Sequence, residues 1–543
     1  MSVSIIIPAY QASDRVAATV AAARRIAGVT EIVVVDDGSR DGTAEAARGA
    51  GADQVIVLPH NRGKGHALRV GVAAAAGDTL LFLDSDLGDS AARAGALLEA
   101  IAGRQAMSIA VLPKRERTGG FGLAKGLAAA VIRLFTGLRL SAPLSGQRAL
   151  PAAVVRRIGM APRWEVEVAL TVEAAHLGIP IREVPVDFEH RHTGRDAVGF
   201  RHRFRQFSDI LRYALPMAYG LGWPALRPGQ VAVRVAVWFA AFAALLGLGW
   251  RAGVGVYLPV QFAFWTVASL LLWLPSLWFS TVVLRRRKTN YLGRNLPGAA
   301  GLLLPLVALL AVTLDLVGWL DPWSDHVSLA YALVLVTFGA VGLLDDLLAT
   351  RGRQARGLRG HFAALLQGRV TTGAVKALGG LAGAVAAVAV LRGGVPQPWP
   401  WLCDSLLIAL AANSLNLLDL RPGRALKGFL LLAGLALALR SFLPLVFGPL
   451  LAAVLVYAPS DLAGRVLLGD VGANALGAAA GLMLVLALPP TGRLIAVILL
   501  LALHLYCERA SLTDLIARHR VLRFLDQLGT RHLPPLPIGE EAR

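Results

Sequence analysis

Strand-length apolar runs alternate with helix-length segments over roughly the first 190 residues of the chain. We expect strands at 3–8, 31–35, 54–58, 79–83 and 184–190, and helices at about 13–27, at 64–76, and between Ser39 and Ala50. Such regular alternation is typical of a parallel sheet with helices on both faces. The N-terminal part is therefore predicted to be an α/β domain with a doubly wound, mainly parallel sheet.

The pattern changes after residue 228, where apolar runs of bilayer-spanning length follow one another. Hydrophobic residues make up 56% of the chain and the mean hydropathy is +0.59, which is too apolar for a wholly soluble protein. We expect an all-α polytopic membrane domain of about ten helices. The expected spans are 229–250, 255–284, 297–319, 327–344, 372–391, 402–418, 425–440, 443–458, 472–488 and 492–507.

Charged loops indicate the orientation of these spans. The loops at 285–288, 351–369 and 421–427, together with Arg465, are basic and fall on one side, which the positive-inside rule places in the cytoplasm. An even number of spans then puts both termini there. The run at 2–9 lacks the basic flank and cleavage site of a signal peptide. We therefore expect a multi-pass protein of the cell (inner or plasma) membrane with a cytoplasmic N-terminal domain.

Composition excludes two other classes of protein. The net charge of +19 raises the question of nucleic acid, but the basic residues cluster beside apolar spans, so we expect no nucleic-acid partner. The two cysteines, Cys403 and Cys507, lie in or at the edge of apolar runs and form no Cys-x-x-Cys metal pair. Whether the protein forms a homo-oligomer is left open by the sequence.

Residues 191–212 join the two parts and are rich in Arg and His. Phe200, Phe204, Phe207 and Leu211 recur at spacings of three to four, with arginines on the other faces. This pattern predicts an amphipathic basic helix in the headgroup layer. A solvated surface helix is the alternative, but the expected span that starts shortly afterwards favours the interfacial position.

Four acidic or glycine-marked segments punctuate the α/β part. Two of them, Val35–Ser39 and Leu83–Asp86, bring carboxylates to the ends of apolar strands, where open α/β sheets build their ligand crevices. The other two are Asn61–Gly65 and Ser145–Arg148. One acidic pair for a nucleobase or ribose and a second for a metal on a diphosphate would suit a nucleotide sugar.

In this order the four segments resemble family 2 glycosyltransferases, and the polyprenyl-phosphate branch in particular. The resemblance implies a GT-A-like fold, an inverting single-displacement transfer, and Mg²⁺ or Mn²⁺ held by Asp84 and Asp86 beside the diphosphate. It implies donor-binding roles for Pro8, Asp36, Asp37, Lys64 and Asp84.

The same resemblance implies catalytic roles for Asp86, Glu165 and Arg148. Taken alone, Asp84-Ser85-Asp86 could be a turn at the end of a strand without a functional role. Glu165 and Glu167 could equally be carboxylates on a helix surface.

A lipid phosphate needs cationic, multi-donor partners at headgroup depth. Arg195, Arg201 and Arg203, at the start of the basic juxtamembrane helix, are the candidates. Simple contact with anionic lipids is the alternative for these three arginines.

Aspartates also gather at the ends of the expected spans. Asp345, Asp346, Asp419 and Asp470 all fall on the predicted cytoplasmic side, and ionisable residues at membrane depth are functional candidates. Residues 255–507 resemble the polyprenyl-phosphate N-acetylhexosamine-1-phosphate transferase family, which includes translocase I. The resemblance implies a second metal site of Asp345, Asp346, Asn416, Asp419 and Asp470.

Two departures from that second family affect the expected chemistry. Leu420 and Pro422 replace a Gly and an Asp of the family's pattern, and a late His-rich loop is missing. Sugar-1-phosphate transfer and a divergent lipid-binding or anchoring role therefore both stay open for the membrane half.

Together these features predict a membrane-bound transferase that moves a sugar from a nucleotide-diphosphate sugar to a polyprenyl phosphate in cell-envelope glycan synthesis. A bifunctional enzyme, a lipid transporter or flippase with a nucleotide-sugar-binding domain, and an anchor with an inactive head are the alternatives. The expected divisions are 1–195 (glycosyltransferase), 196–228 (juxtamembrane), 229–507 (membrane, with 255–507 transferase-like) and 508–543 (tail).

Overall fold

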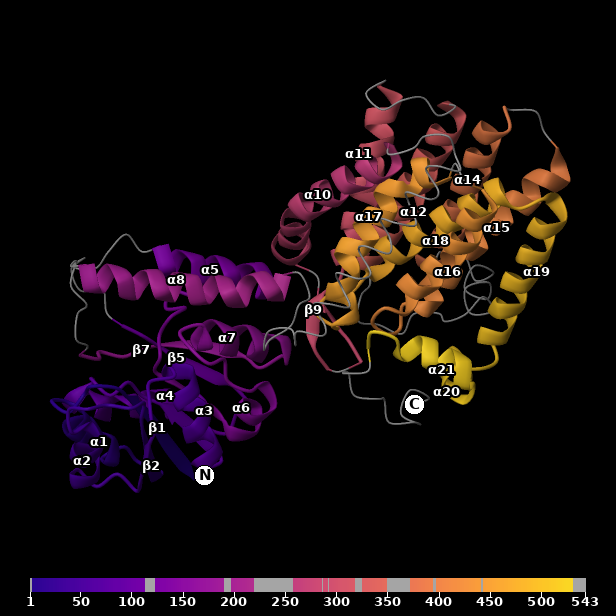
Figure 1. Ribbon diagram of the computed structural model, residues 1–543. Helices are drawn as coiled ribbons and strands as arrows, with labels where there is room; N and C mark the ends of the chain where they lie inside the picture. Colours follow the sequence, from indigo (N-terminus) through magenta and orange to yellow (C-terminus); the bar gives the residue numbers. More distant parts are fainter. Residues whose placement is uncertain are drawn as a thin grey trace. The chain divides into compact units, whose positions relative to one another are not determined.

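The computed structural model describes residues 2–112, 123–189, 197–218, 257–285, 287–291, 293–317, 325–348, 372–393, 397–440 and 443–530. The chain divides into two units. The first consists of Met1–Met217 with Gly293–Asn295 and is an α/β unit; the second consists of Ala218–Leu292 with Leu296–Arg543 and is mainly helical (Figure 1).

A seven-stranded sheet in the order β3-β2-β1-β4-β6-β5-β7 forms the centre of the first unit. The pairs β3-β2, β2-β1, β1-β4 and β5-β7 are parallel, whereas β6 runs antiparallel to both β4 and β5. The mainly parallel α/β fold is thus confirmed. The strands are β1 (Val3–Ala9), β2 (Val29–Asp36), β3 (Gln54–Val57), β4 (Thr79–Phe82), β5 (Met107–Val111), β6 (Arg148–Pro151) and β7 (Ile181–Pro185).

Two of these strands, β5 and β6, were not anticipated from the sequence. Strand β6 has only four residues, begins with a charged residue and ends on Pro151, so neither length nor alternation marks it. Its partners in the sheet decide that it is a strand. Strand β7 begins at Ile181 rather than at 184 and ends at Pro185.

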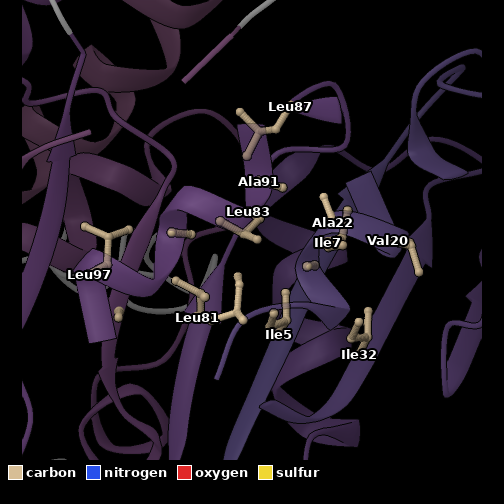
Figure 2. Packing of buried hydrophobic residues seen from close by; sticks show 14 of the residues in the cluster. Ile5, Ile7, Val20, Ala22, Ile32, Leu81, Leu83, Leu87, Ala91 and Leu97 are labelled. Atoms are coloured by element: carbon tan, nitrogen blue, oxygen red, sulfur yellow. The ribbon is translucent and has the colours of Figure 1, made fainter. Parts of the chain in front are cut away.

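Helices cover both faces of this sheet. Ile5 and Ile7 lie in a buried cluster with Val20 of α1, Leu81 and Leu97 (Figure 2). On the other face, Ile6 packs so closely on α3 that a Cβ at Gly71 would lie 2.4 Å from its Cγ2. Burial on both faces explains why β1 is continuously apolar.

The helices of the first unit are α1 (Val16–Arg24), α2 (Thr43–Gly49), α3 (Lys64–Ala74), the 3₁₀ segment η1 (Gly88–Ala94), α4 (Gly95–Glu99), α5 (Leu123–Thr136), α6 (Ala152–Ile158), α7 (Val166–His176) and α8 (Ala197–Ala218). Helices α1, α2 and α3 occupy the connections where the sequence pattern predicted helices, and α8 lies within the segment predicted to be a basic juxtamembrane helix.

The second unit is built around α18, whose side chains are nearly all buried. Its small residues allow close packing: a Cβ at Gly477 would lie 2.5 Å from the carbonyl oxygen of Ala411 in α15. The helices are α10 (Tyr257–Trp278), η2 (Phe279–Val283), η3 (Ala300–Leu302), α11 (Leu303–Leu316), α12 (Asp325–Leu348), α14 (Thr372–Leu391), α15 (Pro398–Leu418), α16 (Arg424–Leu439), α17 (Leu443–Leu462), α18 (Gly469–Ala487), α19 (Pro490–Cys507), α20 (Leu512–Arg518) and α21 (Arg520–Gln527). Two short strands, β8 (Arg287–Thr289) and β9 (Asn295–Pro297), pair with each other.

Six helices in the described ranges are long and apolar enough to cross a membrane. Two further apolar helices, Ala300–Leu316 and Val375–Leu391, are shorter. Of the other expected spans, 229–250 lies outside the described residues, and 425–440 corresponds to α16. With 16 residues, α16 is only about 24 Å long and falls short of a bilayer core. The expected number of about ten spans is therefore not confirmed. The six candidates are Tyr257–Val283, His326–Leu347, Pro398–Leu418, Leu443–Leu462, Gly469–Ala487 and Pro490–Cys507.

Candidate functional site

Two neighbouring aspartates organise the carboxyl end of β2. The Asp36 carboxylate accepts a hydrogen bond from the Ser39 amide at 2.9 Å and closes the turn. Both Asp37 oxygens accept main-chain bonds at 2.8 Å, from the Arg62 and Gly63 amides. Asp37 therefore ties the loop before α3 to the end of β2. Pro8, the remaining predicted donor residue at this edge, pairs in β1 with Val35 of β2.

The conformation and packing of the loop held by Asp37 depend on two glycines. Gly63 has a φ of +99°, which L side chains rarely adopt. A Cβ at Gly65 would lie 1.8 Å from the carbonyl oxygen of Ala161, so the start of α3 can approach that chain only with glycine there. The result is a fixed position for Lys64, the first residue of α3.

Lys64 connects this loop to the end of β4. Its Nζ lies 2.6 Å from Asp84 Oδ1 and 3.0 Å from Glu167 Oε1, and it lies over the Trp164 ring. Burial alone would lower the pKa of Lys64, but the carboxylates of Asp84 and Glu167 outweigh burial and raise it. The side chain of Lys64 therefore stays positively charged. The second Asp84 oxygen accepts a bond from Gln147 Nε2 at 2.6 Å.

Close packing brings the fourth predicted segment to the same place. A Cβ at Gly146 would lie 2.4 Å from Lys64 Nζ and 2.9 Å from Asp84 Oδ1. Only a glycine lets the chain between Ser145 and Gln147 pass so near the lysine–aspartate pair. All four segments singled out in the sequence thus converge at the carboxyl ends of β2 and β4.

The Asp84-Ser85-Asp86 turn is held through its main chain. Thr19 Oγ1 donates to the Ser85 carbonyl at 2.9 Å, and Arg15 Nη1 donates to the Asp86 carbonyl at 3.2 Å. Among the residues that the structure describes, no group of three or more His, Cys, Asp or Glu side chains is placed to hold a metal. Two carboxylates one residue apart nevertheless fit Mg²⁺ or Mn²⁺, because such ions are commonly held by one or two carboxylates with substrate phosphates completing the shell.

Arg148 is buried, and its guanidinium is bound internally. It donates from Nε to the Ser145 carbonyl at 2.7 Å, and from Nη1 to the Glu167 carbonyl at 2.8 Å and to Thr171 Oγ1 at 2.7 Å. Burial lowers the pKa of Arg148 to about 10. These bonds make it a positioning residue that fastens the Gly146 loop to α7. Direct contact with substrate, which the resemblance implied, stays a prediction.

Glu165 differs from its neighbour Glu167. It is 2% exposed, and its Oε2 has no hydrogen-bond partner among the described residues. Burial raises the pKa of Glu165 to about 7. A buried carboxyl that titrates near neutrality is typical of a functional site.

Two of the three predicted lipid-phosphate residues belong to α8. Arg195 lies outside the described residues, while Arg201 and Arg203 belong to α8 but their side chains are not described. Along the rest of α8, Tyr213 is buried and Phe204 is 63% exposed. A helix is thus present in this segment, and its place at the membrane surface stays a prediction.

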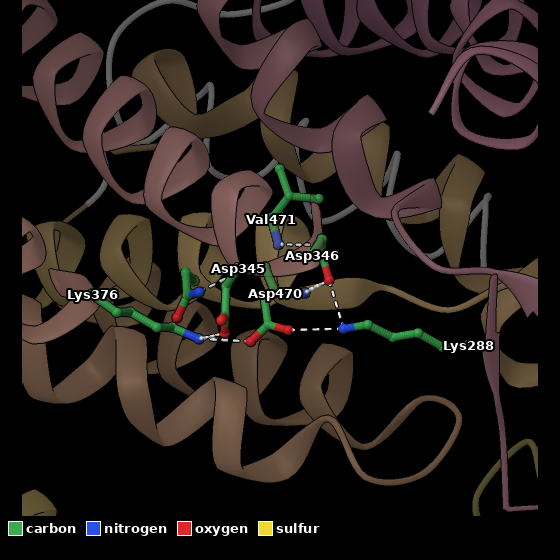
Figure 3. Close-up of polar contacts among 7 residues, drawn as sticks. Lys288, Asp345, Asp346, Lys376, Asp470 and Val471 are labelled. Carbon is green, nitrogen blue, oxygen red and sulfur yellow. Dashed lines mark hydrogen bonds and ion pairs between the residues drawn. The ribbon is translucent and has the colours of Figure 1, made fainter. Parts of the chain in front are cut away.

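The second unit brings together three of the predicted membrane aspartates (Figure 3). Asp345 and Asp346 lie near the end of α12, and Asp470 near the start of α18. The Asp346 carboxylate accepts the amides of Asp470 at 3.2 Å and Val471 at 3.0 Å. This fixes the start of α18 against the end of α12.

Two lysines that sequence reasoning did not single out lie among these carboxylates. Lys288 Nζ lies 2.7 Å from Asp346 and 3.0 Å from Asp470; Lys376 Nζ lies 2.6 Å from Asp470 and 3.3 Å from Asp345 (Figure 3). Lys376 could have been found from the sequence, because it lies inside the apolar run at 372–391, where the positive-inside rule gives no reason for a charged residue. Each of the three carboxylates is therefore paired with at least one ammonium group.

The remaining members of the predicted second metal site are Asn416 and Asp419, at the end of α15. Burial raises the pKa of Asp419, and the charges of Asp461 and then Asp470 add to this effect. Asp419 thus lies within electrostatic range of the cluster, and metal binding by this set stays a prediction.

Comparison with known proteins finds similarity in the N-terminal part of the chain. Residues 4–132 match the family described as Glycosyl transferase family 2. The chain is 36% identical over 95 residues to undecaprenyl-phosphate 4-deoxy-4-formamido-L-arabinose transferase of Pectobacterium atrosepticum, covering 16% of this chain and 29% of the relative. It is 38% identical over 101 residues to dolichyl-phosphate beta-glucosyltransferase of Drosophila melanogaster, covering 16% and 31%.

The chain is also similar to a solved structure, that of glucosyl-3-phosphoglycerate synthase from Mycobacterium tuberculosis in complex with Mg²⁺ and uridine diphosphate. The sequence identity is 25% and the TM-score is 0.34, and the matched region covers 39% of this chain and 79% of the synthase chain. That similarity is too low to support an inference. The chain spans less than a third of the length of the two curated relatives. The likeness of 255–507 to sugar-1-phosphate transferases stays a prediction. The first unit of this chain therefore contains a family 2 glycosyltransferase domain.

Proposed function

We propose that this protein is a membrane-bound glycosyltransferase that moves a sugar from a nucleotide-diphosphate sugar to a polyprenyl phosphate. The observation that carries the proposal is the convergence of Asp37, Lys64, Asp84 and the Gly146 loop at one edge of the sheet. The first three of these lie within residues 4–132, which match family 2. Within the described part of the chain, six helices are long and apolar enough to cross a membrane. The two relatives named above are, by their names, transferases of undecaprenyl phosphate and dolichyl phosphate.

In this proposal the carboxyl edge of the sheet holds the donor. Asp36 and Asp37 bind the nucleoside, and Asp84 and Asp86 hold Mg²⁺ or Mn²⁺ against the diphosphate. When bound, the metal supplies positive charge that stabilises the leaving nucleoside diphosphate. Lys64 fixes the Asp84 carboxylate and keeps the nearby Glu167 charge balanced.

The acceptor phosphate is already an anion and needs little help from a general base. Its oxygen attacks the anomeric carbon while the bond to the nucleoside diphosphate breaks, which inverts the configuration there. Catalysis then rests on positioning and on stabilising the leaving group. Arg201 and Arg203 on α8 are proposed to hold the lipid phosphate, and the site is proposed to face the cytoplasm of a cell that builds an envelope glycan.

The test is glycosyl transfer by membranes supplied with labelled nucleotide sugars and undecaprenyl phosphate. Asp86→Asn should lower turnover by roughly 3–4 kcal/mol of transition-state stabilisation, because it removes charge where the metal meets the leaving group. The matched control is Asp89→Asn, on an exposed side chain of the next turn whose partner is Arg25. Wild-type turnover by Asp86→Asn in excess Mg²⁺ and Mn²⁺ would refute the assignment.

The lysine–aspartate cluster favours a second candidate, in which the membrane unit also transfers sugar-1-phosphate to polyprenyl phosphate. Lys288 and Lys376 supply two cations beside three carboxylates. The group lies at the ends of apolar helices, whereas transporter sites lie near the bilayer midplane. A phosphate-handling site therefore fits better than a flippase.

A further inference from the structure

Three cationic side chains at the junction of α15 and α16 converge on one residue of the C-terminal helix α21. The Asp526 carboxylate accepts hydrogen bonds from Arg424 Nε at 2.8 Å and from Arg424 Nη2 at 3.0 Å. Arg421 Nη1 lies 3.8 Å from the same carboxylate, and Lys427 Nζ donates to the Asp526 carbonyl at 2.5 Å. These three side chains therefore form an anion-binding site that a distant part of the same chain occupies.

The cationic side of this site is positioned by contacts of its own. Arg424 is 4% exposed, and the Arg421 guanidinium lies 5.7 Å from the centroid of the Tyr291 ring. Between the two arginines, Gly423 has a φ of +74° and donates its amide to Asp461 Oδ2 at 2.7 Å. The turn that carries both arginines is thus fixed by contacts that do not involve α21.

The charge of the site fits a phosphoryl group better than it fits a carboxylate. Each of the three side chains carries a positive charge, whereas Asp526 brings one negative charge to the point where they meet and offers Lys427 only a neutral carbonyl oxygen. A phosphate monoester carries a charge of about −2 near neutral pH and has three strong acceptor oxygens. The fork of an arginine binds phosphate and carboxylate with the same geometry.

Helix α21 can leave the site without exposing a buried side chain of its own, because none of its residues is buried. Its neighbour α20 differs, since it buries Thr513 and Ile516 and receives a hydrogen bond from Arg424 Nη1 on Thr513 Oγ1 at 3.1 Å. We therefore expect α21 to detach while α20 stays in place.

The site lies close to the ends of two candidate spans. Helix α15 ends at Leu418, three residues before Arg421, and α19 ends at Cys507, shortly before α20 begins at Leu512. The ends of a helix that crosses the hydrocarbon core lie near the polar headgroups. A lipid phosphate and a phosphate in water can therefore both reach this position.

We propose that Arg421, Arg424 and Lys427 form a phosphate-binding site, and that Asp526 occupies it until a phosphoryl group takes its place. The ligand is a phosphate carried by a lipid or free in water. When it binds, α21 detaches, so this helix is an internal competitor that lowers the affinity for phosphate. The inference does not depend on glycosyl transfer, because all of these residues belong to the second unit.

The first experiment measures binding of radiolabelled inorganic phosphate to the full chain in maltoside micelles, which contain no phosphate. Asp526→Ala should bind it about tenfold more tightly than the wild type, because the internal competitor is gone. Adding Lys427→Met should reverse this gain. Asp514→Ala removes an exposed carboxylate of α20 and is the matched control, with wild-type affinity expected. Size-exclusion chromatography checks that each variant is folded.

The second experiment follows α21 with trypsin, which cuts at Arg518, Arg520 and Arg523. Undecaprenyl phosphate should speed cleavage of the wild type at these sites, whereas undecaprenol, which lacks the phosphate, should not. Inorganic phosphate is compared with chloride at the same ionic strength. Asp526→Ala should be cut rapidly in every condition. Faster cleavage with the lipid alone would assign the site to a lipid headgroup, and faster cleavage with inorganic phosphate would assign it to free phosphate.

Three results would overturn the proposal. Equal phosphate affinity in the wild type and Asp526→Ala would show that Arg424 and Asp526 form an ion pair and nothing more. A gain in affinity that survives Lys427→Met would place the phosphate elsewhere on the protein. Unchanged cleavage of the wild type with both undecaprenyl phosphate and inorganic phosphate would show that phosphate does not displace α21.

Discussion

Glu165 shows how burial alone changes the chemistry of one side chain. It precedes α7 with its carboxyl removed from water, whereas Glu167, two residues on, is paired with Lys64. Burial raises the pKa of Glu165 to about 7 from 4.5. Two glutamates two residues apart thus have different surroundings: Glu165 is buried with no partner for Oε2 among the described residues, and Glu167 is ion-paired with Lys64.

This difference predicts a pH-dependent stability. Because the folded pKa of Glu165 exceeds the unfolded value, the contribution of Glu165 to the stability of the unit is fully present below about pH 4.5 and is lost between that value and about pH 7. At about 1.4 kcal/mol per pKa unit the loss is roughly 3 kcal/mol. In the Glu165→Gln variant the first unit should therefore be cleaved by protease more slowly than in the wild type at pH 8. Near pH 5 the two proteins should be cleaved at the same rate.

The control for that comparison is Glu99→Gln, on an exposed side chain of α4. An advantage of Glu165→Gln that is the same at both pH values would show that the carboxyl does not titrate in this range.

Lys64 is the second residue whose environment fixes its role. Lys64→Met would leave Glu167, 6% exposed, and Asp84, 26% exposed, without their cation. Removing one partner of a buried pair costs about 3–5 kcal/mol. The first unit should then be cleaved faster by protease, and adding Glu167→Gln should restore part of the resistance. Lys125→Met, on an exposed position of α5, is the control. If the double variant is cleaved as fast as Lys64→Met alone, the loss of protease resistance comes from altered packing and not from the unpaired carboxylates.

At the scale of elements, the loop between α5 and β6 completes the first site. Arg148 fastens it to α7, Gln147 holds Asp84, and Gly146 lets it pass close to Lys64. The loop thus forms one side of the candidate site at the ends of β2 and β4. The membrane unit uses small residues in the same way, since a Cβ at Gly342 of α12 would lie 2.3 Å from the Asp470 carbonyl.

Gly146→Ala tests this loop. Its Cβ would meet the mobile end of Lys64, which can shift, so the fold should persist while the Lys64–Asp84 contact is displaced. A misplacement of about 1 Å can cost about 100-fold in rate. We expect a loss of glycosyl transfer of about 10- to 100-fold with little change in protease resistance. Gly126→Ala, where a new Cβ meets nothing within 4 Å, should leave both unchanged. Full activity of Gly146→Ala would contradict the close packing.

For the whole molecule, the two aspartate sets belong to separate compact units. Asp84 and Asp86 lie at the edge of a sheet, whereas Asp345, Asp346 and Asp470 lie at the ends of packed helices. Each set has its own cations and its own packing partners. The two can therefore be disabled independently.

Asp470→Asn should spare nucleotide-sugar binding by the first unit and impair lipid handling by the second. It removes the carboxylate that Lys288 and Lys376 share. Donor affinity measured by equilibrium dialysis should stay within about twofold of the wild-type value, since sites without shared partners behave additively.

We expect wild-type turnover to release nucleoside diphosphate. Release of nucleoside monophosphate would show that the membrane unit transfers sugar-1-phosphate, and lost donor affinity in Asp470→Asn would show that the units are coupled.

The sequence by itself determined the division into an α/β part and an apolar helical part, because hydrophobic periodicity is a local property of the chain. It also placed β1 to β4 and the acidic strand ends, since buried parallel strands are continuously apolar and end in polar turns. The order of four motifs then indicated the family.

Only the tertiary structure decided the features that depend on distant partners. Strand β6 exists because β4 and β5 flank it, although its four residues carry no strand pattern. Lys64 and Gln147 reach Asp84, and Glu167 reaches Lys64, from separate segments of the chain. Lys288 and Lys376 likewise reach the membrane aspartates from segments distant in sequence. No local pattern encodes such contacts, because the free energy of a charge pair depends on burial and distance that packing alone sets.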